Sequence, residues 1–433
     1  MDPIVERGRG AEPRAGAMRL GGRWLVGILG VALALRVAWA LAVPVMPISD
    51  SAIYEGYARM VATGQGYALP PEKPGDPVEL SCFWPPGTNF AYAALFRVFG
   101  TPDHAGYAPI LVFNIVLGVS GVWLLVRLVE RVLSRRIALV AGALMALWPM
   151  GVEFSSLLQS EVPFTFLVLL GMVAWVELKG RPVWRGILAG LVFAAATYVR
   201  PTALLLPVAL ALIELVPAPR RATTVLSAGL ALLVMGAGFA PWALRNQRIF
   251  GEFVLISANS GSNLWMGNNP NTKGEYMPLP PTPGLNEAQR DRHLGREAKA
   301  YIRAHPGAFL GRTLYKLAKL HDRQNIGVGW NERGLAALGA GGAITAMKVL
   351  SSAYQYAVLG LGVLGAGVVL ARHGVMGLAG NPLLGVWAYF ALLHAIYVTQ
   401  DRYSFPLTPM VMALAAKALV VLVRRRRGGG GHG

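Results

Sequence analysis

Charged residues are scarce in this chain, because they make up 14% of its 433 positions while hydrophobic residues make up 54%. A soluble domain carries about 25% charged residues, so the composition excludes an ordinary soluble fold. We therefore predict a multi-pass integral membrane protein of the all-α class.

Cysteine is almost absent as well. The single Cys82 cannot form an internal disulfide, and its neighbours Phe83 and Trp84 indicate a packed side chain. The sequence also lacks GxxxxGK[ST], a GxGxxG that follows a strand, and HExxH, so nucleotide-driven chemistry has no support.

Basic residues dominate the charge, and the formal net charge is +18. About half of them stand at the ends of apolar segments, as short cytoplasmic loops require during membrane insertion. They form no aromatic-interleaved stripe on a soluble domain, so the sequence predicts contact with membrane lipids and no nucleic-acid binding.

Apolar segments recur along the chain at the length that spans a bilayer, about 20 residues. We predict about ten spans with both termini cytoplasmic. They cover 24–43, 107–128, 137–154, 162–178, 185–199, 202–217, 223–243, 352–371, 376–398 and 405–423. A further apolar stretch, 335–350, predicts a re-entrant or interfacial helix. No internal repeat is visible, which weakens a transporter reading.

The polar segments divide the chain. Residues 1–18 and 424–433 are expected to be cytoplasmic tails, the first disordered and the second basic and Gly-rich. Between them, 19–423 forms the transmembrane domain, with a first outer loop at 44–106 and a large outer segment at 244–350. The pattern over 287–319 predicts two short helices broken at Pro306. The outer segment is long enough for a small domain or a cover over the membrane face.

Two carboxylates fall on the outer face under the charge rule. Asp50 precedes a helical pattern at 53–61, so it caps that helix or acts in catalysis. Glu161 begins an apolar span, where an acid is costly unless it is paired or faces a wet cavity; its alternative role is to favour the helix dipole. Two acids on one face would suit base catalysis on an acceptor.

Arginines reach the same face. Arg200 and Arg402 each end or begin a span, and each binds either lipid headgroups or a substrate phosphate. The run 259–270, which contains Asn268 and Asn269, is dense in Gly, Asn and Ser beside Trp265. Two roles are open for this run: it forms simple turns, or its backbone NH groups point together at an anion or a sugar.

Taken in order over most of 24–423, these segments resemble the GT-C membrane glycosyltransferases. The closest branch is the bacterial family 39-like group, which includes protein O-mannosyltransferases and the aminoarabinose transferase of lipid A. The matching features are Asp50 with Tyr54 and the turn at 64–67, Trp84-Pro85-Pro86-Gly87, Ser160-Glu161, Arg200-Pro201, Pro241-Trp242 with Arg245-Asn246, Gly267-Asn268-Asn269-Pro270, and Arg402-Tyr403 before Pro406.

The resemblance implies a GT-C-like helical bundle with amphipathic helices and loops on the extracytoplasmic side of the cytoplasmic (inner) membrane. It implies inverting transfer of a sugar from a polyprenyl-phosphate donor to a lipid, glycan or protein acceptor. Asp50 would be the base or positioner of the acceptor, and Glu161 would support the acceptor or a metal. Arg200, Arg245 and Arg402 would bind the donor phosphate, and the further substrate-binding candidates are Tyr54, Tyr403, Asn268 and Asn269. No cofactor is certain: some members bind a divalent metal and others do not.

Two departures bear on the acceptor. Protein mannosyltransferases generally carry an Asp-Glu pair in the first loop, whereas Ser51 follows Asp50 here. The soluble domain of some members is absent or reduced to 244–350. Both disfavour protein O-mannosylation. The alternatives to an enzyme are a transporter or flippase of lipid-linked sugars and a non-catalytic membrane protein of envelope assembly.

Overall fold

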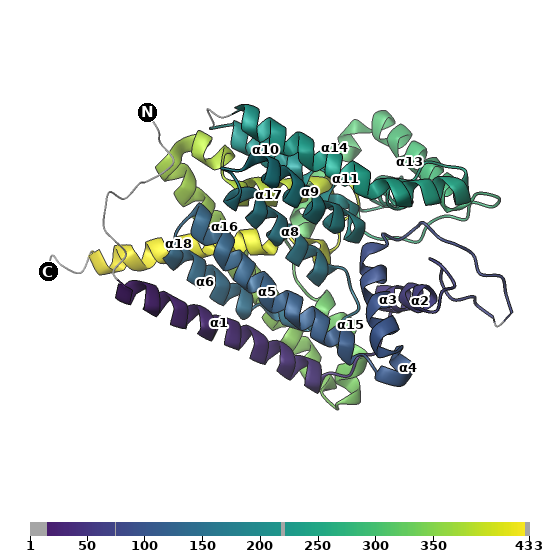
Figure 1. Cartoon of the computed structure of the whole chain (residues 1–433), viewed down its shortest axis with the longest axis horizontal. Coiled ribbons are helices and arrows are strands. Elements are labelled where there is room, and N and C mark those ends of the chain that lie inside the picture. The colour runs from purple at the N-terminus through teal and green to yellow at the C-terminus, as the bar shows by residue number, and fades with distance from the viewer. Residues whose placement is uncertain (1–14, 74, 218–220, 429–433) are drawn as a thin grey trace.

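The computed structural model describes residues 15–73, 75–217 and 221–428, and these ranges fold into helices without a β-sheet (Figure 1). The predicted all-α class is therefore confirmed. Most of the predicted tails, at 1–14 and 429–433, lie outside the described residues. The apolar helices are α1 (Ala15–Ala42), α5 (Ala108–Val132), α6 (Arg135–Ala146), α8 (Glu161–Glu177), α9 (Pro182–Val199), α10 (Leu206–Leu215), α11 (Arg221–Phe250), α16 (Ile344–Ala379), α17 (Pro382–Ile396) and α18 (Thr408–Gly428).

Shorter or more polar helices join these. They are α2 (Asp50–Ala62), α3 (Gly87–Phe99), α4 (Pro102–Ala105), α7 (Pro149–Glu153), α12 (Ser260–Gly267), α13 (Glu287–Ala304), α14 (Pro306–Leu320) and α15 (Ile326–Ala337), with 3-10 turns η1 (Phe154–Ser156), η2 (Pro201–Ala203), η3 (Gly341–Ala343) and η4 (Asp401–Ser404). The first outer loop thus contains α2, α3 and α4. The predicted break at Pro306 is confirmed, since α13 ends at Ala304 and α14 begins at Pro306.

Five of the described helices are long and apolar enough to cross a membrane, judged by length and composition. They cover Gly22–Ala42, Ala108–Val132, Pro182–Val199, Arg221–Phe250 and Gly341–Ala379. A sixth candidate combines Arg135–Ala146 with Pro149–Ser156, which are bent by 59° at the break. Pro201–Leu215 and Pro382–Ile396 are apolar but shorter. The integral-membrane class is confirmed, and the count of about ten spans stays a prediction.

One predicted helix is wrong. The stretch 335–350 is divided: α15 ends at Ala337, Gly339 follows with a φ of 73°, and α16 begins at Ile344. Glycine adopts positive φ without a steric penalty, so Gly339 ends α15 in the manner of a helix C-terminal glycine. The apolar residues after it belong to the first turns of α16.

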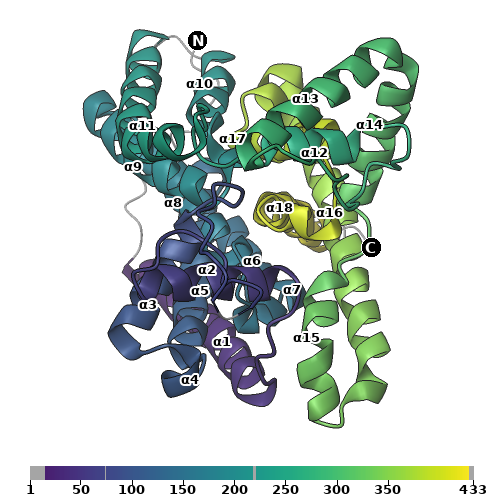
Figure 2. The same ribbon diagram turned by 90° about the vertical axis from the view of Figure 1, so that its right-hand side faces the viewer.

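Helix α18 is the centre of the molecule. It packs against α6, α16 and α17, and Figure 2 shows it end-on among the other helices. Its residues 412–416 are completely buried, so this segment contacts protein on every side. Arg402 belongs to η4, which lies just before the N-terminus of this buried helix.

Small residues allow the closest helix contacts. A Cβ added at Gly365 of α16 would lie 2.0 Å from the Leu414 carbonyl of α18, and one at Gly190 of α9 would lie 2.9 Å from the Ala231 backbone of α11. Membrane helices commonly pack backbone to backbone at such residues. These contacts fix how α18 and α9 present the residues at their ends.

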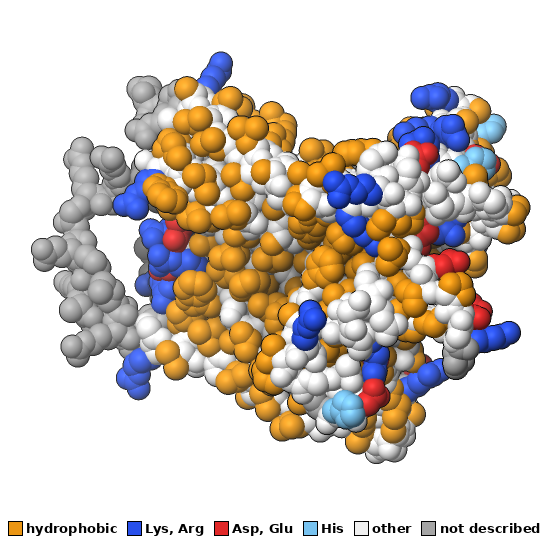
Figure 3. All heavy atoms as spheres, turned by 45° about the vertical axis from the view of Figure 1, so that its right-hand side comes forward, with side chains coloured by type: hydrophobic (Ala, Val, Ile, Leu, Met, Phe, Trp, Pro, Cys, Tyr) orange, Lys and Arg blue, Asp and Glu red, His pale blue; other side chains and the backbone are white. Residues whose placement is uncertain are grey.

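The surface separates into zones. In Figure 3 the middle of the visible face is largely hydrophobic, and charged side chains gather at its ends. Figure 1 places α2, α3, α4 and α13 at the end opposite the start of α1 and the end of α18. A hydrophobic middle with charged ends is typical of a protein whose central part lies in a bilayer.

Candidate active site

Asp50 begins α2, but its side chain does not cap the helix. Ser49 occupies the N-cap with φ 51° and ψ −128°, and no side-chain capping hydrogen bond is present there. The Asp50 carboxylate instead lies 2.6 Å, Oδ2 to Nη1, from Arg402. Of the two roles that the sequence left open, the geometry does not support capping.

Glu161 begins α8 directly after the tight turn, and its side chain is completely buried. Its Oε1 accepts a hydrogen bond from Nη2 of Arg200 at 2.5 Å, while Nε of Arg200 donates to Ser160 Oγ at 2.8 Å. Oε1 also lies 3.8 Å from Nη1 of Arg402. Burial of a carboxylate is costly unless it is paired and hydrogen-bonded, and both arginines pair with Glu161 here.

Arg402 therefore joins the two acids. Its Nη1 contacts both carboxylates, its Nε donates to Gln400 Oε1 at 2.8 Å, and its guanidinium lies 4.9 Å from the centre of the Trp330 ring. Burial, the largest single effect, would lower the pKa of Arg402, but Asp50, Tyr403 and Glu161 together outweigh it and raise that pKa above its ordinary value. The group is a permanent cation. We call Asp50, Glu161, Arg200 and Arg402 the acid–arginine cluster.

Two tyrosines border the acid–arginine cluster. The Tyr403 ring lies 5.3 Å from the Arg402 guanidinium and 5.7 Å from that of Arg200. Tyr54 is buried on α2, and burial raises the pKa of its hydroxyl. That hydroxyl therefore stays protonated at neutral pH and can serve as a hydrogen-bond donor. The structure thus brings six of the predicted site residues together.

Three predicted residues lie elsewhere. Arg245 donates to the Ser81 carbonyl at 2.7 Å and stacks on Trp242 at 4.7 Å. Asn268 and Asn269 donate their side-chain amides to backbone carbonyls of their own turn, and Asn268 donates to Ile396 as well. In the described contacts none of the three touches the acid–arginine cluster. They hold the first outer loop and the turn after α12 in place.

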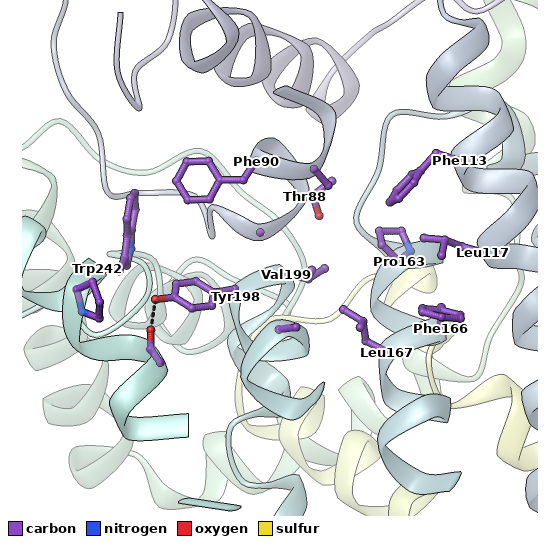
Figure 4. A pocket seen from close by; sticks show the side chains of 15 residues that line it. Thr88, Phe90, Phe113, Leu117, Pro163, Phe166, Leu167, Tyr198, Val199 and Trp242 are labelled. Carbon is purple, nitrogen blue, oxygen red and sulfur yellow. Dashed lines mark hydrogen bonds between the residues drawn. The ribbon is translucent and has the colours of Figure 1, made fainter. Parts of the chain in front are cut away.

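An apolar cavity of about 730 Å³ lies beside the cluster (Figure 4). Its walls come from α3, α5, α8, α9 and α11. The side chains labelled in Figure 4 are Thr88, Phe90, Phe113, Leu117, Pro163, Phe166, Leu167, Tyr198, Val199 and Trp242. Val199 directly precedes Arg200, and Pro163 is two residues beyond Glu161. One end of an apolar chain in this cavity would therefore lie close to two charged side chains.

A second, polar cavity of about 480 Å³ reaches the cluster through a different neighbour. Its lining includes Gln400, the residue to which Arg402 donates. Lys319, Arg323 and Lys348 line it too, together with Glu275 and Asp401. The two cavities share no lining residue. Sequence reasoning missed these cations, because each lies on a different helix or turn of the outer segment.

Sequence reasoning also missed His394 and Trp330. His394 is buried on α17, and its ring stacks on that of Tyr403 with centroids 4.7 Å apart. A histidine inside an apolar segment is a signal that could have drawn attention to it. Trp330 lies in the large outer segment, and nothing in its local sequence indicates that it covers Arg402.

Comparison with known proteins places part of the chain beside a described family. Residues 84–244 match the family model described as dolichyl-phosphate-mannose-protein mannosyltransferase. No curated protein sequence matches the chain.

Solved structures match over nearly the whole chain. The archaeal oligosaccharyltransferase AglB from Archaeoglobus fulgidus, in complex with an inhibitory peptide and a dolichol-phosphate, is 13% identical, with a TM-score of 0.57, and the match covers 95% of this chain and 52% of that one. The same organism's oligosaccharyltransferase in complex with Zn and sulfate is 15% identical at a TM-score of 0.55, over 92% and 49%. ArnT from Cupriavidus metallidurans bound to undecaprenyl phosphate is 15% identical at 0.43, over 92% and 77%.

At these identities the oligosaccharyltransferase matches establish the fold. This chain spans about half the length of those structures. The family model covers residues 84–244, and together with these folds it confirms the resemblance predicted from the sequence: the chain is similar to the GT-C membrane glycosyltransferases.

Proposed function

We propose that this chain transfers a sugar from a polyprenyl-phosphate donor to an acceptor on the extracytoplasmic side of the cytoplasmic membrane. The observation that carries the proposal is the placement of two acids and two arginines, from four separate segments, beside an open apolar cavity. Its family-model match and its fold are those of enzymes that use lipid-linked sugars.

The donor's isoprenoid chain would occupy the apolar cavity, whose aromatic and aliphatic lining suits a long hydrocarbon. Its phosphate would then lie at the guanidinium groups. In the described contacts of the cluster, Arg200 uses Nε and Nη2, and Arg402 uses Nε and Nη1. One Nη group on each arginine is left to bind the phosphate, a geometry for which the guanidinium fork is suited.

Asp50 would act on the acceptor. The acceptor oxygen attacks the anomeric carbon and passes its proton to the Asp50 carboxylate. The bond from the anomeric carbon to the phosphate oxygen breaks, and its electron pair stays on the phosphate beside the arginines. Attack from the face opposite the leaving group inverts the anomeric carbon. Glu161, which is completely buried, would hold Arg200 and Arg402 in position.

The acceptor would enter through the polar cavity. Amide, cationic and carboxylate side chains line it, so it suits a group rich in hydroxyls or charges. A lipid, a glycan or a protein could present such a group.

A transfer assay tests the proposal. Membranes that contain the chain are incubated with radiolabelled polyprenyl-phosphate sugars, and the label is followed by extraction. We expect label to leave the polyprenyl carrier for a new product, and membranes without the chain to leave the donor intact. Donor that crosses the membrane unchanged would contradict the proposal and indicate a transporter.

A further inference from the structure

The cation that neutralises the two acids is already part of the protein. In the described ranges no three His, Cys, Asp or Glu side chains are grouped so that they could hold a metal ion. Asp50 and Glu161 supply two carboxylates, each in direct contact with a guanidinium. A catalytic zinc site generally has three protein ligands, so these two carboxylates do not make a zinc site by themselves.

Arg402 is held too firmly to be a surface side chain that moves away for a metal. It is 8% exposed. Its Nε is bound by Gln400, its backbone NH donates to Asp401 Oδ1 at 2.9 Å, and Trp330 and Tyr403 flank its guanidinium. It also stands at the start of the central helix, whose position is fixed on all sides.

A divalent ion between the acids would have to lie beside this fixed positive charge. Like charges a few ångströms apart repel strongly where water is excluded. The ion would also compete with Arg200, whose Nη2 already bonds Glu161 at 2.5 Å. Both effects disfavour metal binding in the intact protein.

We infer that Arg402 is the organising cation of the Asp50–Glu161 pair and takes the role that a divalent metal would otherwise fill there. Its guanidinium orients the Asp50 carboxylate and offsets the charge of the buried Glu161, so transfer needs no metal. The link to transfer rests on the proposed function. Whether the acid pair binds a metal ion does not depend on the proposed function, and it can be measured on the folded protein without any transfer assay.

The test uses the full chain purified in detergent. Metal content is measured by mass spectrometry, and the thermal unfolding midpoint is recorded with EDTA and with 1 mM Mn²⁺, Zn²⁺ or Mg²⁺. We expect less than about 0.1 metal ion per chain for wild type and no shift of its midpoint, since a ligand stabilises only the state that binds it.

Removing the guanidinium should create the metal site. In Arg402→Ala the two carboxylates face the space that the guanidinium filled. We expect the thermal unfolding midpoint of this variant to lie below that of wild type when no metal is added. Addition of Mn²⁺ or Zn²⁺ should then raise the midpoint of the variant by on the order of 3 °C. The double variant Arg402→Ala with Asp50→Asn should lose that rise. Arg402→Lys keeps the positive charge, so it should fold and stay indifferent to metals. Arg248→Ala, at an exposed position on α11, is the matched control.

The outcomes are decisive in both directions. A wild-type protein that carries about one metal per chain, or whose midpoint responds to EDTA, would overturn the inference. So would an Arg402→Ala protein as indifferent to metals as wild type. If Arg402→Ala does not fold, wild type and Arg402→Lys still decide the question. Absence of sugar transfer with these metal responses intact would count against the proposed function only.

Discussion

Ser49 shows how backbone geometry places the Asp50 carboxylate. It is the one non-glycine residue with positive φ in the described ranges, at φ 51° and ψ −128°. Such conformations cost about 1–3 kcal/mol for residues with a Cβ and persist where the surroundings enforce them. Here the contact between Asp50 and Arg402 holds the first turn of α2 in position.

Relieving this strain should stabilise the protein. We expect Ser49→Gly to raise the free energy of unfolding by about 1 kcal/mol, because glycine adopts this conformation without a Cβ clash. Ser49→Ala keeps the Cβ and should give no gain. Thermal unfolding of both variants in detergent measures the difference. Equal midpoints for the two variants would contradict the strain at this position.

At the residue scale, the sequence predicted the four charged residues that the structure brings together, but it did not predict how they pair. The rule of positive loops placed Asp50, Glu161, Arg200 and Arg402 on one face, and the structure brings these four into contact. The same rule could not separate Arg402 from Arg245, because which side chain reaches the acids depends on how the helices pack. Asn268 shows the same limit: its local motif indicates a turn, and only the fold shows that Lys316 contacts it.

Helix contacts determine the positions of the elements, and glycine controls the tightest ones. We expect Gly365→Ala to destabilise the protein by about 1–3 kcal/mol, because its Cβ would lie 2.0 Å from the Leu414 carbonyl of α18. Gly367→Ala is the control in the same helix, since a Cβ there meets nothing within 4 Å. Unfolding midpoints compare the two. A loss as large for Gly367→Ala would refute the account of this interface.

A buried lysine links the outer helix α14 to α17. Lys316 is completely buried and donates to the carbonyls of Ile396 at 2.9 Å and Gly267 at 3.4 Å. Burial lowers the pKa of Lys316 to about 8. Between that value and its ordinary 10.5, the unfolded chain binds more protons than the folded protein, so stability should rise with pH across this window.

The pH dependence can be isolated with one variant. Lys316→Met removes the titrating group, so the difference in unfolding midpoint between wild type and Lys316→Met should change in favour of wild type from pH 8 to 10. Below pH 8 both states of the wild-type chain hold the proton, and the difference should be constant. A difference that stays constant up to pH 10 would show that the buried amine does not titrate there.

Hydrophobic length predicted most of the helices and failed where helices break. The runs at 107–128 and 185–199 correspond closely to α5 and α9. The predicted span 137–154 is instead bent by 59° where Leu147 and Trp148 separate α6 from α7. A hydropathy pattern records how apolar a segment is, and it carries little information on where the backbone turns.

Under the proposed function, the end of the molecule with α2, α3 and α13 faces the extracytoplasmic side of the membrane. The described surface shows a hydrophobic middle and charged ends, which is compatible with that orientation. The side of the membrane on which the site lies follows from the distribution of Lys and Arg. It is therefore a proposal that labelling can test.

Single cysteines give that test. Cys82 is the one native cysteine and is buried, so Cys82→Ser provides a background without reactive thiols. We expect Glu72→Cys, in the first outer loop, to react with a membrane-impermeant maleimide on intact cells. Lys179→Cys, after α8, should react only after the membrane is opened. The reverse pattern would place the acid–arginine cluster on the cytoplasmic side.

Sugar transfer by an Asp50→Asn variant, measured beside wild type, tests the central claim most directly. The measured quantity is the rate at which label leaves a polyprenyl-phosphate sugar in membranes that contain equal amounts of folded protein. We predict a fall of at least about 100-fold for Asp50→Asn, since a positioned base contributes about 10²–10⁴-fold, and no change for Asp76→Asn at an exposed site of the same loop. Transfer by Asp50→Asn at the wild-type rate would contradict the account.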